Sequence, residues 1–189
     1  MKSIHSSFIG IIILIFGALF NGAFAQNSML IRIQQNIEKE YSNLSHISSD
    51  ELVDWIGSNE DDFLLFDVRE RDEYQVSHLD GSIRVDPSIS FKEFLKRFST
   101  DISGKNLVFY CSVGRRSSSL ASRILEAVDD EQKSKIYNLK HGIFGWHNHE
   151  KPLVTQVGKT DFVHPFAGRW EKLIDRKDLI RYLPEIGNE

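Results

Sequence analysis

Short apolar runs alternate with amphipathic helix patterns along the middle of this 189-residue chain, and this alternation restricts the fold most strongly. Phe63–Val68 and Asn106–Tyr110 are short, largely apolar and bounded by polar or charged neighbours, which is typical of buried parallel strands. Ser82–Val85 and Ile136–Leu139 are weaker strand candidates. Because strands that alternate with helices build βα units, we predict an α/β fold with a central parallel sheet and helices on both faces.

Helical spacing of apolar residues predicts the elements that precede and separate these strands. Such spacing covers residues 30–44, 49–57, 91–98 and 117–128. The second stretch opens on Ser49-Asp50-Glu51, a capping residue followed by acids in the first turn. We therefore expect four helices, the first of them ahead of the sheet.

The amino-terminal segment, 1–25, has the three regions of a secretory signal peptide. Lys2 gives the positive end, Phe8–Phe20 is an apolar run too short to span a bilayer comfortably, and Ala23-Phe24-Ala25 is a cleavage pattern before Gln26. We expect cleavage there and export, most consistent with a bacterial periplasm. The alternative is an uncleaved membrane anchor, the one case in which a membrane is a partner, and sequencing the mature terminus decides between them.

Beyond the signal peptide, the patterns divide the chain into three segments. An accessory helix is expected at 26–45, the main α/β domain at 46–154 and a helical tail at 155–189. A helix docked on the domain is the favoured interpretation of the tail, and a partner-binding helix is the alternative. The helical spacing in the tail is that of Trp170, Leu173, Ile174 and Lys177.

The charge balance and the cysteine count exclude several classes of function. A formal net charge of −4, which becomes −5 if cleavage removes Lys2, gives no basic field for nucleic acid. Cys111 is the single cysteine, so no intramolecular disulfide and no multi-cysteine zinc site can form. One group of possible metal ligands lies close together in the sequence: His141, His147, His149 and Glu150. Its spacing matches no established pattern of metal-binding residues, so we expect no metal and no cofactor.

The residues around Cys111 carry the chemistry. Cys111 directly follows a predicted strand, and ligands of open parallel sheets bind outside the carboxyl ends of the strands. A helix beginning near Ser117 offers free N–H groups, and Arg115 and Arg116 add two cations, so the thiolate is favoured. Gly114 allows a tight curl that points successive amides at one spot. We expect a nucleophilic cysteine, with the two arginines forming a positive patch for an anionic substrate.

Four motifs follow one another in a recognisable order. They are Phe66-Asp67-Val68-Arg69-Glu70 with Glu73-Tyr74, Ser77-His78-Leu79-Asp80-Gly81-Ser82, Tyr110-Cys111-Ser112-Val113-Gly114-Arg115-Arg116-Ser117, and Leu139-Lys140-His141-Gly142-Ile143-Phe144-Gly145-Trp146 with Pro152. In this order they resemble the rhodanese-like family of sulfurtransferases, over roughly residues 48–154. The resemblance implies a rhodanese-like domain, here a single-domain sulfurtransferase with an exported form.

The resemblance also implies a mechanism and a set of substrates. A cysteine of the family takes sulfane sulfur from a donor such as thiosulfate, carries it as a persulfide, and passes it to a thiol or another thiophilic acceptor, which can be a protein. By motif, that cysteine is Cys111. The substrate-binding residues are then those of the loop that follows: Ser112, Val113, Gly114, Arg115 and Arg116.

Five further residues support the site according to the same resemblance. Asp67 is a structural acceptor at the end of its strand rather than a general base, because a thiolate held by amides needs no base. Arg69 and Glu73 are expected to form an ion pair of modest energy beside it. His78 is a hydrogen-bonded turn residue rather than a catalyst, and Ser117 closes the loop.

Two alternatives to sulfur transfer stay open. Related phosphatases handle phosphate or arsenate on a loop one residue longer, whereas Cys111 to Arg116 is six residues here. Ser117 stands where those phosphatases place an arginine, and Tyr110 where they carry a histidine, so phosphatase or arsenate reductase chemistry is disfavoured. The other alternative is a non-catalytic rhodanese-like module that binds a partner or senses sulfur species. The intact loop favours the enzyme.

Overall fold

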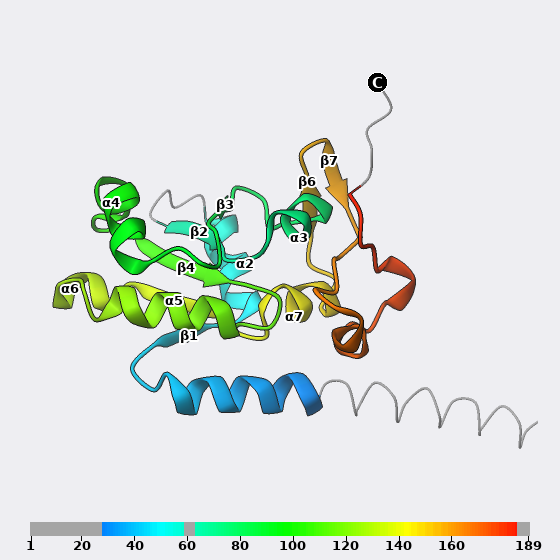
Figure 1. The fold of residues 1–189 in the computed structure, drawn as a ribbon, viewed down its shortest axis with the longest axis horizontal. Helices are drawn as coiled ribbons and strands as arrows, with labels where there is room; N and C mark the ends of the chain where they lie inside the picture. Colours follow the sequence, from blue (N-terminus) through cyan, green and yellow to red (C-terminus); the bar gives the residue numbers. More distant parts are fainter. Residues whose placement is uncertain (1–27, 59–62, 185–189) are drawn as a thin grey trace, which may run out of the picture.

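A computed structural model describes residues 28–58 and 63–184, and its centre is a five-stranded sheet in which every pair of neighbouring strands is parallel (Figure 1). The strand order is β1-β5-β4-β2-β3. The strands are β1 (Ser45–Ile47), β2 (Phe63–Asp67), β3 (Ile83–Arg84), β4 (Asn106–Tyr110) and β5 (Ile136–Leu139). The predicted α/β fold is confirmed, whereas the predicted signal peptide lies outside the described residues.

Helices cover both faces of the sheet. They are α2 (Ser49–Gly57), α3 (Arg71–Val76), α4 (Phe91–Ile102), α5 (Arg115–Leu125), α6 (Asp130–Lys133) and α7 (Gly142–Asn148), together with a helical segment at 28–40. Sequence patterns miss α3, α6 and α7 because helices of six, four and seven residues are too short to show an apolar period. The start of α5 is Arg115, two residues before the predicted Ser117. Among the described residues, no helix has the length and apolar character needed to cross a membrane.

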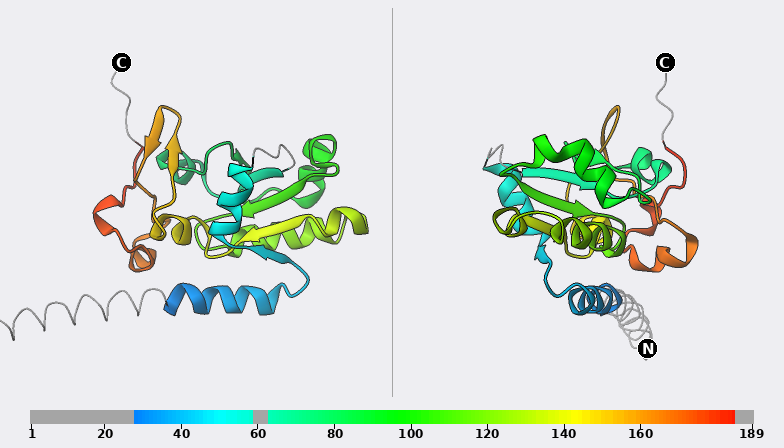
Figure 2. Two further views of the ribbon diagram at one scale, coloured as in Figure 1. Left: turned by 180° about the vertical axis from the view of Figure 1, so that it is seen from behind. Right: turned by 60° about the vertical axis from the view of Figure 1, so that its left-hand side comes forward.

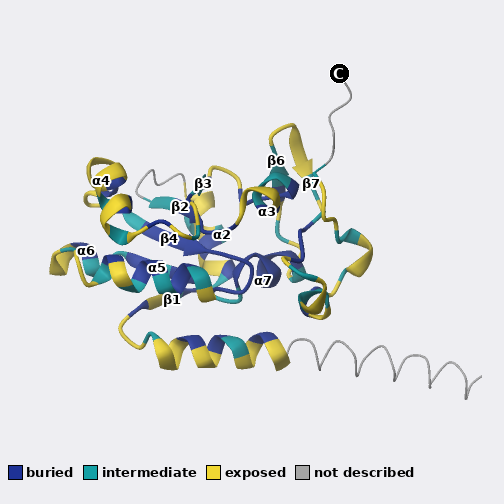
Figure 3. Cartoon of the chain, in the orientation of Figure 1, coloured by how far each residue is buried: buried dark blue, intermediate teal, exposed yellow. Residues whose placement is uncertain are grey.

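Two apolar cores lie on opposite faces of the sheet, as the alternation of side chains along a strand requires. Leu107 and Phe109 of β4 belong to the core beneath α4 and α5, and Val108 and Tyr110 belong to the other core. Figure 3 shows the strands as the buried centre, with exposed residues gathered on the outer faces of the helices. Residue pattern and packing therefore agree, and each face of the sheet is covered.

Serine side chains cap the starts of two of these helices. Ser48 caps α2, one residue before the predicted start: its Oγ accepts from the Glu51 amide at 3.2 Å, and its own amide donates to the Glu51 carboxylate at 2.8 Å. Ser90 caps α4 by accepting from the Glu93 amide at 3.1 Å. These contacts satisfy N–H groups that the first turn of a helix leaves without partners.

The segment at 28–40 lies along the β1 side of the domain, beneath α5 (Figure 2). Gln34 accepts the backbone N–H of His141 at 3.1 Å, and Glu40 pairs with Arg115 at 2.8 Å. The predicted accessory helix therefore reaches the two loops that follow β5 and β4.

The tail differs from the single helix predicted by the spacing of its apolar residues. It begins with a hairpin of β6 (Leu153–Thr155) and β7 (Gly158–Thr160), which spans the expected boundary between residues 154 and 155. Its helical parts are two 3-10 helices, η1 (Gly168–Leu173) and η2 (Lys177–Leu179). The tail lies at the carboxyl end of the sheet, beyond α7 (Figure 1).

Asn148 gives the physical reason why η1 does not continue as a longer helix. Its Nδ2 donates to the Leu173 carbonyl at 2.9 Å, and its Oδ1 accepts from the Asp175 amide at 3.0 Å. These are backbone groups that a continuing helix would have paired within itself. Leu173 and Ile174 are fully buried at this point, so the tail is part of the core of the domain.

Candidate active site

Cys111 lies directly after β4, at the carboxyl end of the sheet, and is only 1% exposed. Its carbonyl accepts the Ile143 amide at 2.9 Å, and the carbonyl of Ser112 accepts the Phe144 amide at 3.1 Å. The first turn of α7 therefore holds the start of the loop. Gly142 makes this approach possible, because a Cβ there would lie 2.3 Å from the carbonyl oxygen of Cys111.

The other end of the loop is fixed to β5. Gly114 has a φ of 93°, a conformation that favours glycine, and it forms the N-cap of α5. Ser117 Oγ contacts two oxygens, the Gly114 carbonyl at 3.1 Å and Asn138 Oδ1 at 2.6 Å. The N-terminus of α5, with N–H groups that have no carbonyl of their own helix to bind, therefore stands directly after the loop.

Glu73 of α3 organises the side chains beside Cys111. Arg116 donates to both of its carboxylate oxygens, at 2.8 and 2.9 Å, and Ser112 Oγ donates to one of them at 2.7 Å. Arg116 also donates to Ser112 Oγ at 2.9 Å, so the three side chains form a closed network.

The network shifts the pKa values of its charged members in opposite directions. Burial alone would raise the pKa of Glu73, but the hydrogen bonds and charge of Arg116, with smaller effects of Arg69 and Ser112, hold it below its ordinary value. Burial alone would lower the pKa of Arg116, but its hydrogen bonds to Glu73 and its interaction with Cys111 raise it. Both groups are therefore held in their charged forms.

Arg69 pairs with Asp67 instead of Glu73, which corrects the predicted ion pair. Its Nη2 lies 2.6 Å from Asp67 Oδ2 and its Nε 2.9 Å from Oδ1, and both residues are fully buried. The guanidinium also donates to the backbone carbonyls of Ser77, at 2.6 Å, and Glu73, at 3.4 Å. Because the side chain of Glu73 is taken by Arg116, Arg69 serves to join the end of β2 to the end of α3.

His78 makes its contacts with Tyr74 of α3. Its Nδ1 donates to the Tyr74 carbonyl at 3.0 Å, and its ring stacks on that of Tyr74 with centroids 3.8 Å apart. Burial lowers the pKa of His78. Tyr110 donates to Ser82 Oγ at 2.9 Å and accepts from the Leu79 amide at 3.1 Å, so it connects β4 to the segment that carries His78.

A pocket of about 140 Å³ opens beside Cys111. Phe166 and Trp170 of the tail form part of its wall, and sequence reasoning missed both because no local pattern shows that the tail returns to this loop. The ring of Phe166 lies 4.7 Å from Arg116 Cζ and 6.3 Å from the ring of Trp170. The lining residues are Cys111, Ser112, Val113, Arg115, Arg116, Phe166 and Trp170.

The two arginines do not form the free positive patch expected from the sequence. Arg116 is paired with Glu73, and its side chain is 25% exposed. Arg115 is paired with Glu40 at 2.8 Å, with both side chains about half exposed, at 51% and 47%. Each cation beside Cys111 thus has a carboxylate partner, which reduces the field that an anion would meet.

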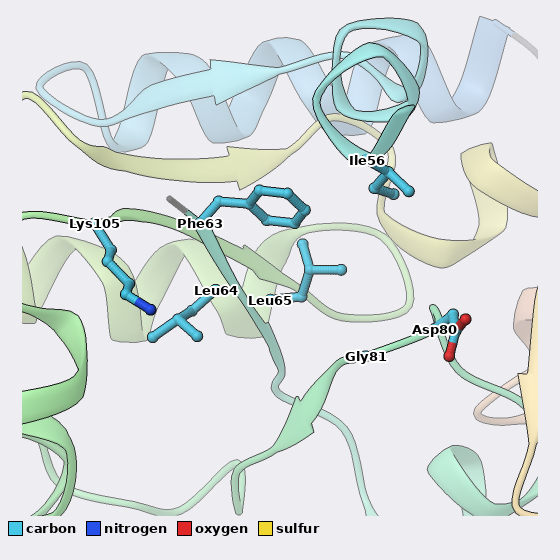
Figure 4. A pocket seen from close by; sticks show the side chains of 7 residues that line it. All are labelled: Ile56, Phe63, Leu64, Leu65, Asp80, Gly81 and Lys105. Carbon is cyan, nitrogen blue, oxygen red and sulfur yellow. The ribbon is translucent and has the colours of Figure 1, made fainter. Parts of the chain in front are cut away.

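A second pocket, of about 580 Å³, lies at the opposite, amino ends of the strands (Figure 4). It has no cysteine or histidine in its wall and is away from Cys111, so it is not part of the candidate site. Its lining residues are Ile56, Phe63, Leu64, Leu65, Asp80, Gly81 and Lys105.

The histidines that are close in sequence after β5 serve separate contacts. His147 donates from Nε2 to the Asp161 carbonyl at 2.9 Å, and His149 Nδ1 lies 3.1 Å from Ser49 Oγ. His141 adopts a φ of 63° in the turn before α7. In the part of the chain that the structure describes, no group of three or more His, Cys, Asp or Glu residues is arranged to hold a metal ion.

Comparison with known proteins adds a family and a fold. Residues 48–149 match the family described as the rhodanese-like domain. A curated relative, the probable molybdopterin-synthase adenylyltransferase of Porphyra purpurea, is 30% identical over 100 residues. That match spans 52% of this chain and 24% of the relative, so it concerns a minor part of the longer protein.

Solved structures of similar fold share little sequence with this chain. A Rhodopseudomonas palustris protein of unknown function, described as a possible tyrosine phosphatase, is 17% identical with a TM-score of 0.50. The similarity covers 64% of this chain and 92% of that protein. Thiosulfate sulfurtransferase from Pseudomonas aeruginosa is 18% identical with a TM-score of 0.49, over 65% of this chain and 22% of that one. At these identities a structural similarity concerns the fold alone.

Proposed function

This chain belongs to the rhodanese-like domain family, and from that premise we propose that it is a sulfurtransferase that carries sulfur as a persulfide on Cys111. One observation carries the proposal. The chain's single cysteine lies in a buried loop between the carboxyl end of β4 and the N-terminus of α5, and it lines a pocket. This is where an α/β sheet binds ligands and where a helix stabilises negative charge.

The first half-reaction loads the cysteine. The Cys111 thiolate attacks the outer sulfur of a donor such as thiosulfate, and a new S–S bond forms. The original S–S bond breaks, and sulfite leaves with its electron pair. Negative charge then resides on the persulfide, which the N–H groups at the start of α5 and the side chain of Arg116 can stabilise.

The second half-reaction removes the outer sulfur from the Cys111 persulfide. A thiolate acceptor attacks the outer sulfur of the persulfide, so that the acceptor gains the sulfur and the Cys111 thiolate is restored. No oxidant or reductant is consumed in either step. The role of the chain is to hold the loop, and with it the sulfur of Cys111, in place, which agrees with the contacts that fix both ends of the loop.

Phosphate ester chemistry receives less support from the same loop. Ser117 occupies the position where related phosphatases carry an arginine, and it is fully buried with contacts to Gly114 and Asn138. The neighbouring Arg116 is bound to Glu73. Neither residue offers a free fork of donors for a tetrahedral anion.

Mass spectrometry of the intact protein tests the proposal. Incubation with thiosulfate is expected to add one sulfur atom to the wild type, and a thiol acceptor is expected to remove it. Cys111→Ser is expected to fold, to gain no sulfur and to have no transferase turnover. Wild-type protein blocked with iodoacetamide is the matched control.

Two results would contradict the proposal. Turnover above the uncatalysed rate in Cys111→Ser would exclude a persulfide on this residue. A wild-type protein that gains no sulfur from either thiosulfate or a small organic persulfide would favour a non-catalytic module that uses the same loop for binding.

A further inference from the structure

We propose that Phe166 and Trp170 form an apolar subsite beside Cys111 that binds the uncharged organic group of the sulfur substrate. The inference rests on the proposed sulfur transfer and names the class of substrate: an organic sulfur compound with an apolar group of about phenyl size. Both residues lie outside the segment 48–149 that matches the family, so the subsite comes from this chain's own tail.

The wall of the pocket is the first argument. Beside Cys111 and Ser112 it is lined by Val113, the two aromatic residues and the two arginines, and almost all of its exposed surface is apolar. Phe166 is 39% exposed, and its backbone is held at a φ of 65° while its amide donates to His164 Nδ1 at 3.0 Å. A large apolar ring kept partly exposed at the mouth of a reactive site can gain burial from a ligand.

The ion pairing of the two arginines is the second argument. Arg116 has its guanidinium occupied by both oxygens of Glu73, and the ring of Phe166 lies against it at 4.7 Å. Arg115 is paired with Glu40. Neither arginine of the pocket wall therefore offers an unpaired charge to a small inorganic dianion, whereas an organic group can exchange water for apolar surface.

The size of the pocket is the third argument. Its volume is about 140 Å³. An apolar protein cavity of about 150 Å³ is known to bind benzene. A phenyl group therefore fits in this space next to the sulfur atom of Cys111.

Two thiosulfonate anions provide a matched pair of probes. Benzenethiosulfonate and methanethiosulfonate carry the same charge and the same transferable outer sulfur, and they differ in the organic group. In both, the Cys111 thiolate takes the outer sulfur and the corresponding sulfinate leaves with the electron pair. Dividing each kcat/KM by the uncatalysed rate of the same donor with a free thiol removes the difference in leaving group.

The wild type is expected to prefer benzenethiosulfonate by roughly tenfold after this correction, because burying a ring of this size against aromatic walls is favourable. Phe166→Ala and Trp170→Ala are expected to lower that ratio several-fold. Trp170→Phe should retain most of the ratio, since it keeps an aromatic ring at this position. It removes the five-membered ring of the indole, whose N–H is buried without a partner among the described residues. Phe162→Ala is the control, because Phe162 is an aromatic residue of the same tail that does not line the pocket.

The outcomes separate this inference from the proposed function. A corrected ratio near one in the wild type, or equal proportional losses with both donors in Phe166→Ala and Trp170→Ala, would overturn the apolar subsite. Failure of both thiosulfonates to load Cys111 in the wild type would instead overturn the proposed function. If Trp170→Ala does not fold, Phe166→Ala and Trp170→Phe still decide the question.

Discussion

At the scale of single residues, two buried ion pairs determine how the loop and its scaffold are held. Asp67 with Arg69 is fully buried, and Glu73 with Arg116 is buried on the side of the carboxylate. Such pairs add little stability over apolar replacements, but loss of one member leaves an uncompensated charge. Of the two acids, Glu73 is the one that also binds Ser112 of the cysteine loop, so we expect its substitution to have the larger effect on function.

Glu73→Gln is expected to lower the free energy of unfolding at neutral pH by about 3 kcal/mol, at the low end for a buried pair because Arg116 is a quarter exposed. The pKa of Glu73 is lowered in the folded state, so its stabilisation is complete above the unfolded value of 4.5 and disappears as the pH falls through the folded value. Urea unfolding measured at several pH values is expected to show that the wild type loses this contribution below pH 4.5 while Glu73→Gln does not.

Glu126→Gln serves as the control for this titration, because Glu126 is an exposed acid at the end of α5. It is expected to follow the wild-type curve. If Glu73→Gln and the wild type lose stability in parallel below pH 4.5, Glu73 is not the group responsible.

At the scale of secondary structure elements, the cysteine loop is held by two helices, one next to it in the sequence and one distant in the sequence. The helix α5 follows the loop in the chain, whereas α7 reaches it through space and binds its first two carbonyls. The contact requires the backbone of α7 to approach closely at Gly142, where a Cβ would meet the Cys111 and Ser112 backbone at 2.3 and 2.8 Å. The position of the Cys111 backbone is therefore coupled to the packing of α7.

Gly142→Ala is expected to lower stability and to slow the loading of Cys111, because the added methyl group must displace the backbone of the loop. Gly104→Ala is the matched control, since Gly104 also has a positive φ, 75° against 58°, but has nothing within 4 Å of an added Cβ. Both variants bear the conformational strain, about 1 kcal/mol. Only Gly142→Ala should lose about 2 kcal/mol more and reduce the rate of Cys111 alkylation by iodoacetamide.

If the two substitutions change the free energy of unfolding and the alkylation rate equally, the loop backbone can move aside for the added methyl group at no cost in free energy. In that case α7 would not control the position of Cys111. Urea unfolding and the alkylation rate of both variants, measured together, distinguish the strain from the clash.

At the scale of the whole molecule, segments from both ends of the described chain converge on the carboxyl end of the sheet (Figure 2). The helical segment at 28–40 contacts Arg115, and the tail contributes Phe166 and Trp170 to the pocket. Leu173 and Ile174 of the tail are fully buried in the core that also holds α2 and α7. The site is therefore completed by parts of the chain that the matched family segment does not contain.

Leu173→Ala is expected to reduce the free energy of unfolding by about 3 kcal/mol, because it removes a fully buried side chain from the core. Leu183→Ala is the matched control in the same tail: Leu183 is 78% exposed, and its loss should change stability by less than about 0.5 kcal/mol. Urea unfolding of the two variants provides the test. A small effect of Leu173→Ala would mean that the tail is dispensable for the fold and docks only loosely on the domain.

Much of the central domain follows from local patterns. The apolar runs at Phe63 and Asn106 become β2 and β4 within one residue of their predicted ends, and the run at Ile136 becomes β5. Their sequence is informative because a strand buried on both faces has to be apolar throughout. The position of Cys111 at a strand end is likewise local information, since only its immediate neighbours define it.

The partners of the charged side chains could not be predicted from their neighbours along the chain. The sequence places Asp67, Arg69 and Glu73 within a few residues of one another, yet Glu73 pairs with Arg116 from a different βα unit. Pairing between charges depends on which elements the fold brings together, and a linear pattern does not contain that distance. The pairing of Arg115 with Glu40 of the helical segment at 28–40 has the same cause.

Local patterns therefore predicted four of the five strands of the central sheet, its longer helices and the residue types of the cysteine loop, because each depends on neighbours along the chain; β1 and the short helices α3, α6 and α7 were not predicted. The packed structure was needed to show that α7 holds the loop, that both arginines are paired, and that Phe166 and Trp170 form part of the wall of the pocket. These contacts join segments far apart in the chain, and their free energy comes from burial and pairing that exist only after the segments have packed.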